Sequence, residues 1–182
     1  KNIILQSLAS LLEERNLSKV TTSLLAEKSK ITEAALYRHF PSKRAIYAEL
    51  FSFCDEAIFA KCGELKKSKL SSKEKTKNAF LFFMIFIEKN KGFARLLSRE
   101  ALSADEKNVS DSVNLFFERF ELSIKQMLSE DSDNLITQAG ISSQLIITCL
   151  EWNVGRYIRS KFKDTPSTYI ENVWELLSIS IF

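Results

Sequence analysis

The sequence is short of the residues that interrupt helices, because it has only 4 glycines and 2 prolines among 182 residues. So few breakers favour long helices over a sheet joined by tight turns. It also has only 3 cysteines, Cys54, Cys62 and Cys149, whose number and spacing fit neither a disulfide framework nor a zinc site. We therefore expect a protein of the reducing cytoplasm that uses no metal and no cofactor.

Long apolar runs are lacking as well. The most apolar stretch, residues 79–87, is far shorter than the ~20 residues that a membrane-spanning helix needs. No secretory signal is recognisable in the sequence. The first residue is Lys1 rather than Met, so we expect a short arm to precede it in the natural chain. The sequence thus predicts no membrane partner.

The constellations that enzymes use are missing too. The single histidine is His39. No serine or cysteine can therefore draw on a second histidine as a general base. Asp131 and Asp133 are neighbours in a polar stretch, where solvation explains them better than a metal ion does. We conclude from the sequence that the chain is not an enzyme.

What the sequence does contain is helical periodicity and apolar bulk, with 45% hydrophobic residues and 14 phenylalanines. Apolar residues recur at spacings of three and four. Ser71 with Glu74, Ser103 with Glu106 and Thr168 with Glu171 have the spacing of capping boxes. The sequence predicts an all-α fold of about nine helices over residues 2–14, 23–28, 33–39, 42–65, 71–90, 93–101, 103–129, 136–162 and 168–182.

Positive charge gathers at one end of the chain. Residues 1–47 carry eight Lys and Arg against four Asp and Glu, whereas residues 48–182 carry eighteen against nineteen. Such a concentration is typical of a module that meets phosphates, although a solvated surface would also account for it. We predict an N-terminal DNA-binding module of three helices over residues 1–47 and a helical body over residues 48–182.

The segment 22–43 reads as a helix-turn-helix, with two short helices joined by a tight turn. Thr22 and Thr32 are expected to cap its two helices. Ala34 and Ala35 are small enough to let the second helix enter a major groove. Apolar side chains are expected to hold the two helices together, namely Leu24, Leu25, Ala26, Ile31, Leu36 and Phe40.

The motif LYRHFPSK, followed by an apolar helix, resembles the end of the recognition helix in TetR-type regulators. The resemblance implies a twofold dimer that binds palindromic double-stranded DNA. It implies DNA contacts from Thr22, Thr32, Glu33, Ala34, Ala35, Tyr37, Arg38, His39 and Lys43. Lys30 stands where the family often has a turn glycine, so this turn is expected either to adjust its conformation or to cost roughly 1 kcal/mol of strain.

Other stretches, among them ILQSLASLLE, LFFERFELSIKQML and RYIRSKFKDTPS, are similar to the SlmA-type nucleoid-occlusion subgroup of that family. This resemblance implies a cytoplasmic, nucleoid-associated protein that restrains the division protein FtsZ. It also implies partner contacts from Phe53, Lys61, Lys89 and Asn90. The lysines replace arginines of the subgroup, which removes a bidentate donor. For Phe53 a core position remains the alternative.

Dimerisation is expected to use two apolar stripes near the C-terminus. They could equally pack inside one subunit, and the family resemblance favours the interface. The first stripe consists of Leu145, Cys149 and Trp152, and the second of Ile170, Val173, Trp174 and Leu177.

A small-molecule effector is the competing second ligand, because many TetR-type regulators bind one in the helical body. Residues 79–87, AFLFFMIFI, are apolar on every side and predict a buried central helix. Their bulky rings fill space and offer few polar groups to orient a ligand. The sequence therefore favours a protein partner, and an effector-controlled repressor remains the alternative.

Overall fold

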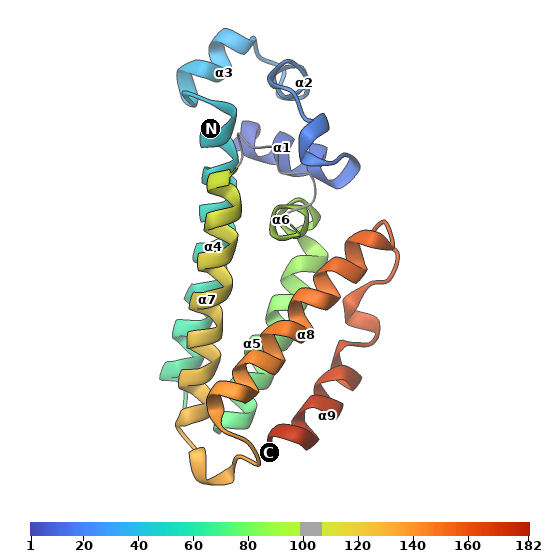
Figure 1. Ribbon diagram of the computed structural model, residues 1–182. Coiled ribbons are helices and arrows are strands. Elements are labelled where there is room, and N and C mark those ends of the chain that lie inside the picture. The colour runs from blue at the N-terminus through green and yellow to red at the C-terminus, as the bar shows by residue number, and fades with distance from the viewer. Residues whose placement is uncertain (99–106) are drawn as a thin grey trace. The chain divides into compact units, whose positions relative to one another are not determined.

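A computed structural model describes residues 1–98 and 107–182, with side chains from residue 110 in the second range. These residues form nine α-helices and three short 3-10 helices and contain no strand, which confirms the predicted all-α class (Figure 1). The helices are α1 (Asn2–Glu14), α2 (Thr22–Lys28), α3 (Glu33–His39), α4 (Lys43–Lys67), α5 (Ser72–Lys89), α6 (Lys91–Leu97), α7 (Lys107–Ser129), α8 (Ala139–Arg159) and α9 (Ile170–Ile181). The 3-10 helices are η1 (Leu17–Lys19), η3 (Ser132–Asn134) and η4 (Pro166–Thr168).

The chain divides into two compact units, and neither is a single stretch of sequence. The first consists of residues 1–55 and 90–114, and the second of residues 56–89 and 115–182. The first unit therefore holds α6 in addition to the three helices that the sequence assigned to residues 1–47. The long helices α4 and α7 each begin in the first unit and end in the second.

The core of the first unit forms around α1, whose apolar face buries Ile4, Leu8, Leu11 and Leu12. Helix α6 packs against this helix at close range. A Cβ atom added at Gly92 of α6 would lie 2.9 Å from the backbone oxygen of Ala9. The absence of a side chain at Gly92 is thus what lets α1 and α6 approach.

The core of the second unit forms around α5, which contacts α8, α9 and η4. Phe80, Phe83, Met84 and Ile87 are all completely buried, as the apolar stretch 79–87 predicted. Their neighbours are further rings, with Phe83 and Phe120 centroids 5.2 Å apart and Phe80 and Trp174 centroids 5.5 Å apart. Stacked and tilted rings at these distances fill the interior of the unit.

The predicted helix ends are partly confirmed. At α5, the Ser71 hydroxyl accepts from the Glu74 backbone at 3.3 Å, and the Glu74 carboxylate accepts from the Ser71 backbone at 2.9 Å. At α9 the prediction was wrong, because the Thr168 hydroxyl donates to the Thr165 carbonyl and Tyr169 precedes the helix. The Ser103–Glu106 box lies outside the described residues.

Helix α8 ends at Arg159, three residues before its predicted end. Lys161 and Phe162 have positive φ values of 56° and 62°, which turn the chain out of the helix. The Phe162 backbone N–H donates to the Tyr157 carbonyl at 2.9 Å, and their rings lie 5.0 Å apart. A ring contact thus stabilises a conformation that side chains usually avoid. None of the described helices combines the length and the apolar character that crossing a membrane requires.

Candidate nucleic-acid interface

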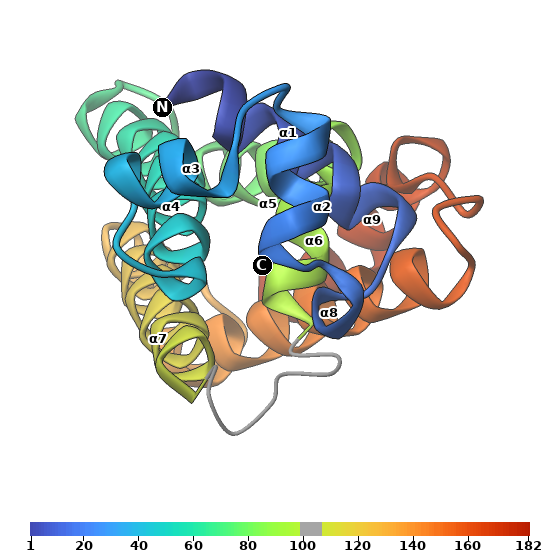
Figure 2. The ribbon, with the colours of Figure 1, turned by 90° about the horizontal axis from the view of Figure 1, so that it is seen from above.

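The helix-turn-helix lies wholly in the first unit and consists of α2, a four-residue turn and α3 (Figure 2). Within the turn, the Ile31 backbone N–H donates to the Ala26 carbonyl at 3.0 Å. Lys30 has a φ of 55°, so of the two expected outcomes the strained non-glycine turn is present rather than an adjusted one. The turn fixes the angle at which α3 leaves α2.

Apolar contacts hold the two helices together, as expected. Leu25, Ala26, Leu36 and Phe40 are each at most 3% exposed. Leu24 and Ile31, also expected at this contact, are half-buried. Because one face of α3 is committed to this core, its remaining side chains are directed to solvent.

The exposed face of α3 carries the side chains that the sequence assigned to DNA. Tyr37 is 46% exposed, a high value for a large aromatic side chain in a packed module. Of the other residues assigned to DNA on α3 and at its cap, Ala35 is half-buried. The remaining ones are exposed, namely Thr32, Glu33, Ala34, Arg38 and His39. The exposed face therefore combines small residues at its start with polar tips at its end, which suits insertion into a groove.

The starts of α2 and α3 are joined by a hydrogen bond that the sequence did not reveal. The Thr22 hydroxyl donates to the Glu33 carboxylate at 2.9 Å. Thr22 was predicted to cap α2, but the cap is Thr21, whose hydroxyl accepts from the Leu24 backbone at 3.1 Å. Thr32 caps α3 as predicted, accepting from the Ala35 backbone at 3.1 Å. Adjacent threonines made the α2 start ambiguous, because either one can cap a helix.

The start of α4 carries Lys43, the remaining cation that the sequence assigned to DNA. Lys43 is half-buried, with its Nζ 3.5 Å from the Leu17 carbonyl and 5.3 Å from the Tyr47 ring centre. Ser42 accepts a hydrogen bond from the Ala45 backbone at 3.1 Å and so caps this helix, as predicted. These contacts hold Lys43 close to a helix N-terminus, where phosphate is favoured.

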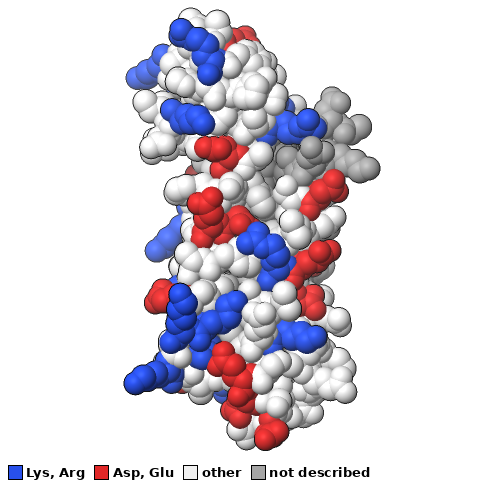
Figure 3. All heavy atoms as spheres, turned by 90° about the vertical axis from the view of Figure 1, so that its left-hand side faces the viewer, with Lys and Arg blue, Asp and Glu red and all other residues white. Residues whose placement is uncertain are grey.

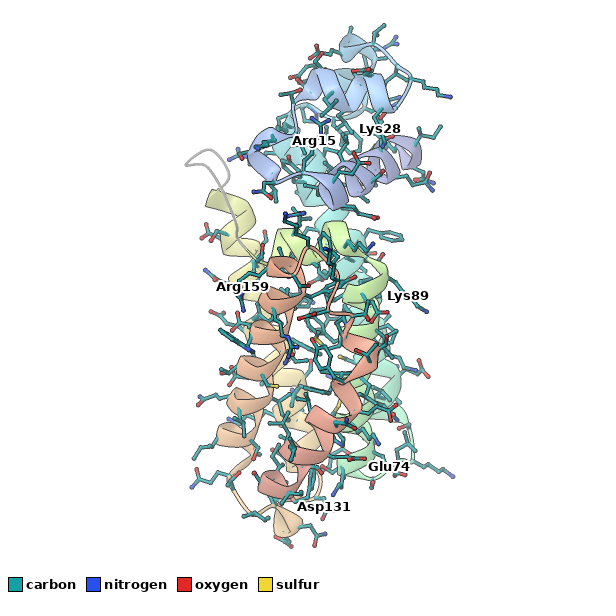
Figure 4. All side chains as sticks on the ribbon, turned by 90° about the vertical axis from the view of Figure 1, so that its right-hand side faces the viewer. Arg15, Lys28, Glu74, Lys89, Asp131 and Arg159 are labelled. Atoms are coloured by element: carbon teal, nitrogen blue, oxygen red, sulfur yellow. The ribbon has the colours of Figure 1, made fainter. Side chains whose placement is uncertain are left out.

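Sequence reasoning did not single out Lys19, Lys30 or Arg44 as DNA contacts. All three side chains are exposed in the first unit. On the face drawn in Figure 3, Lys and Arg side chains stand out at the end of the first unit formed by α2 and α3. Lys28, which is labelled in Figure 4, differs because it pairs with Glu14 of α1 at 3.4 Å. The signal available in the sequence was the local excess of Lys and Arg, which does not say which of them point outward.

The four residues assigned to a protein partner divide between the units. In the first unit, Phe53 of α4 is 66% exposed, which excludes the core position left open for it, and Asn90 is half-buried. In the second unit, Lys89 is exposed and Lys61 is half-buried. The Lys61 ammonium donates to both Glu64 carboxylate oxygens, at 3.0 and 2.9 Å.

The residues assigned to the dimer interface behave differently on the two helices. On α8, Leu145 and Trp152 are 42% and 66% exposed, and Cys149 is half-buried. On α9, Ile170 and Trp174 are only 1% and 2% exposed, because they pack into the core of the second unit. They have almost no area left to bury against a second copy, which corrects their assignment. Val173 and Leu177 are half-buried, and the exposed apolar residues of α9 are Leu176 and Ile179, each 71% exposed.

Two features of the described residues bear on metal binding and nucleophilic chemistry. They contain no group of three His, Cys, Asp or Glu side chains able to hold a metal ion. Burial raises the pKa of the Cys54 thiol to about 12, and burial, opposed by Lys66, raises that of Cys62 to about 11. Both thiols are therefore protonated at neutral pH and are poor nucleophiles.

Comparisons with known proteins agree for both parts of the chain. Residues 4–50 match the family described as bacterial regulatory proteins, tetR family, and residues 73–181 match a SlmA-like family described as tetracyclin repressor-like, C-terminal domain. The nucleoid occlusion factor SlmA of Vibrio campbellii is 33% identical, over 98% of this chain and 93% of its own length. The protein of the same name from Marinobacter nauticus is 31% identical, over 98% and 94%.

Solved structures share the fold at low identity. The transcriptional regulator FadR of Bacillus subtilis, in complex with stearoyl-CoA, has a TM-score of 0.80 at 16% identity, covering 99% of this chain and 98% of its own. NalD of Pseudomonas aeruginosa, the secondary repressor of a multidrug efflux pump, has a TM-score of 0.77 at 17% identity, covering 99% and 95%.

Proposed function

The chain belongs to the TetR family of bacterial regulatory proteins and, within it, to the SlmA-like group, and from this premise we propose that it is a nucleoid-occlusion factor. As a cytoplasmic homodimer it binds palindromic sites on the chromosome and restrains assembly of FtsZ over the nucleoid. The observation that carries the proposal is the extent of the 33% identity, which covers 98% of the chain and so includes the helical body. A shared DNA-binding module alone would support only a DNA-binding regulator.

In this proposal α3 enters the major groove. Ala34 and Ala35 allow close approach to the base edges, and Thr32 and Glu33 face them at the start of the helix. Tyr37, Arg38 and His39 supply donors to bases and to the flanking backbone. Thr22 and Lys43 bind phosphates at the starts of α2 and α4. The support for these roles is that α3 exposes its polar side chains while Leu36 and Phe40 are buried.

A dimer follows from the small footprint of one recognition helix, because palindromic sites pair two of them one helical turn apart. The support is the exposed apolar area on the last two helices. Ile141, Leu145 and Trp152 of α8 and Leu176 and Ile179 of α9 are between 42% and 71% exposed. Leaving so many large apolar side chains in water is unusual for a monomer.

The FtsZ contact is proposed to involve Phe53, Lys61, Lys89 and Asn90. In the second unit, Lys89 follows an apolar surface on α5, where Ile85 is 39% exposed. Phe82 and Phe86 are half-buried beside it, with ring centres 5.9 Å apart. An aromatic surface with a neighbouring cation suits a segment that carries both apolar and acidic residues.

The test is to measure binding of the purified protein to FtsZ, with and without a duplex that carries its specific site. We expect binding that the specific duplex strengthens and that a scrambled duplex does not. Phe53→Ala should abolish the FtsZ contact while leaving DNA affinity unchanged. Leu122→Ala provides a matched control, because Leu122 is a similarly exposed apolar residue at 54% on α7.

The absence of FtsZ binding in the presence of a duplex that the protein binds tightly would reject the proposal. An unchanged FtsZ affinity in both variants would remove Phe53 from the proposed contact. Release of DNA by a small molecule from cell extract, together with no FtsZ binding, would identify an effector-controlled repressor instead.

A further inference from the structure

One arginine on α8 stacks on an aromatic ring and has no acidic partner among the residues that the structure describes. The Arg159 guanidinium carbon lies 4.6 Å from the ring centre of Trp152, which is itself 66% exposed. Gly155 lies between them on the helix, and a Cβ atom there would come within 2.8 Å of Arg159 Nη1. The missing side chain at Gly155 therefore leaves room for the guanidinium to lie along α8 against the indole (Figure 4).

The neighbouring Arg156 has an acidic partner, whereas Arg159 has none among the described residues. The Arg156 Nε donates to the Asp164 carboxylate at 3.2 Å, and its guanidinium lies 4.8 Å from the Tyr169 ring centre. Among the described residues, no ion pair involves Arg159. A guanidinium stacked on indole has already lost much of its conformational freedom, so a carboxylate can bind it at a lower entropic cost.

Helix α9 carries two exposed carboxylates that likewise have no ion-pair partner among the described residues. Glu171 and Glu175 lie four residues apart, so they share one face of the helix. Both are exposed, and no ion pair within the described part of the subunit engages either of them. Leu176 and Ile179, each 71% exposed, continue the same helix. Among the described residues, the cation on α8 and the carboxylates on α9 thus have no ion-pair partner within the subunit.

The end of α8 and the start of α9 meet the same end of α5. The Tyr157 hydroxyl donates to the Glu88 carbonyl at 3.2 Å, and the Ser167 hydroxyl donates to the Glu88 carboxylate at 3.0 Å. The end of α8 that carries Arg159 and the segment that leads into α9 and Glu171 therefore both lie near the Glu88 end of α5. If the twofold axis of the dimer runs parallel to α8 and α9, the same ends of these helices lie side by side in the two copies. An axis perpendicular to the helices would place those ends far apart and separate the charges.

We propose that Arg159, stacked on Trp152, binds the Glu171 and Glu175 carboxylates of a second copy of this chain and so fixes the alignment of the dimer. This inference rests on the proposed dimer and adds the residues that select its arrangement. In a twofold interface each contact occurs twice, so the dimer gains two such clusters. Trp and Arg are the residues that most often dominate interfaces, and charge complementarity excludes wrong alignments.

The test is charge reversal with rescue in the full chain, measured as the dimer dissociation constant by sedimentation. Arg159→Glu should raise that constant about tenfold or more, because each contact becomes repulsive. Glu171→Arg with Glu175→Arg should do the same. An equimolar mixture of the two variants should recover dimers, since both clusters of the heterodimer again pair opposite charges, one of them with the signs exchanged. Lys163→Glu is the control, because it makes the same charge change on an exposed residue outside both helices and should leave dimerisation unchanged.

The outcomes separate this inference from the dimer itself. A wild-type chain that stays monomeric at micromolar concentration would reject the proposed dimer and this contact with it. If the wild-type chain dimerises but Arg159→Glu raises the dissociation constant no more than Lys163→Glu does, the contact is rejected and the proposed dimer stands. A folded Arg159→Glu variant that stays monomeric when mixed with the α9 variant would also reject the pairing. The melting temperature of each variant shows that it is folded.

Discussion

At the scale of single residues, Lys30 gives the turn of the helix-turn-helix a strained backbone conformation. Its φ of 55° places a side chain in the left-handed region, which costs an L residue about 1–2 kcal/mol. The turn keeps this conformation because Ile31 donates its backbone N–H to Ala26 at 3.0 Å. Packing of α2 on α3 therefore outweighs the local preference of Lys30.

Replacing this lysine by glycine should stabilise the fold. Lys30→Gly removes the left-handed penalty but adds about 0.5–1 kcal/mol of chain entropy, so we expect the free energy of unfolding to rise by about 0.5–1 kcal/mol. Urea denaturation measures it. Lys30→Ala removes the same charge and keeps a Cβ atom, so it should bring no gain. A stability equal in the two variants would contradict the assignment of strain to this backbone.

Lys43 is the residue for which a DNA contact is easiest to quantify. Because it is held beside the start of α4, we expect Lys43→Ala to weaken binding to every duplex alike and to lower the salt slope by about 1. Titration of affinity against salt concentration measures both effects. Lys69→Ala, on an exposed lysine of the second unit, should leave the slope unchanged. A slope that does not change in Lys43→Ala would remove this residue from the phosphate contacts.

At the scale of elements, two glycines inside helices have opposite roles. Gly92 lies where α6 meets α1, with the Ala9 backbone oxygen and Cα at 2.9 and 3.0 Å from an added Cβ atom. Gly63 lies inside α4, and nothing is within 4 Å of an added Cβ atom. The sequence alone cannot separate these cases, because both glycines stand among residues with helical periodicity.

The two glycines therefore form a matched pair of substitutions. Gly92→Ala should lower the free energy of unfolding by about 1–3 kcal/mol, because the methyl group meets backbone that cannot move aside. Gly63→Ala should raise it by up to about 1 kcal/mol through helix propensity alone. Thermal or urea denaturation measures both. A tolerated Gly92→Ala variant would mean that α1 and α6 can separate at little cost.

At the scale of the whole molecule, the exposed apolar residues of α9 define the proposed dimer. Leu176→Asp with Ile179→Asp should convert the dimer to a monomer, since two carboxylates would be buried in the interface. The variant should bind a palindromic duplex no better than a half-site. Sedimentation and DNA titration measure the two effects. Leu122→Asp, on an exposed residue of α7, should keep the dimer and the preference for the palindrome.

The outcome that would contradict this prediction is a dimer that survives both substitutions. The interface would then have to lie on other helices. Retained preference for the palindrome by a monomeric variant would instead separate DNA specificity from dimerisation.

By itself the sequence determined the helical class and the place of the helix-turn-helix. These are properties of spacing, composition and backbone preference, which act within a few residues along the chain. It also determined the cap at Thr32, since only one suitable residue stands before that helix. Where two candidates were adjacent, as with Thr21 and Thr22, local preference could not choose between them.

Only the tertiary structure decided which apolar residues remain exposed. Trp152 and Trp174 look alike in the sequence, yet one is 66% exposed and the other is 2% exposed. The difference arises because Trp174 packs on Phe80, far away along the chain, and no local pattern encodes that contact. For the same reason the structure alone revealed Arg159 on Trp152, and it showed that on α9 Ile170 and Trp174 are buried while Leu176 and Ile179 are exposed and available to the proposed dimer.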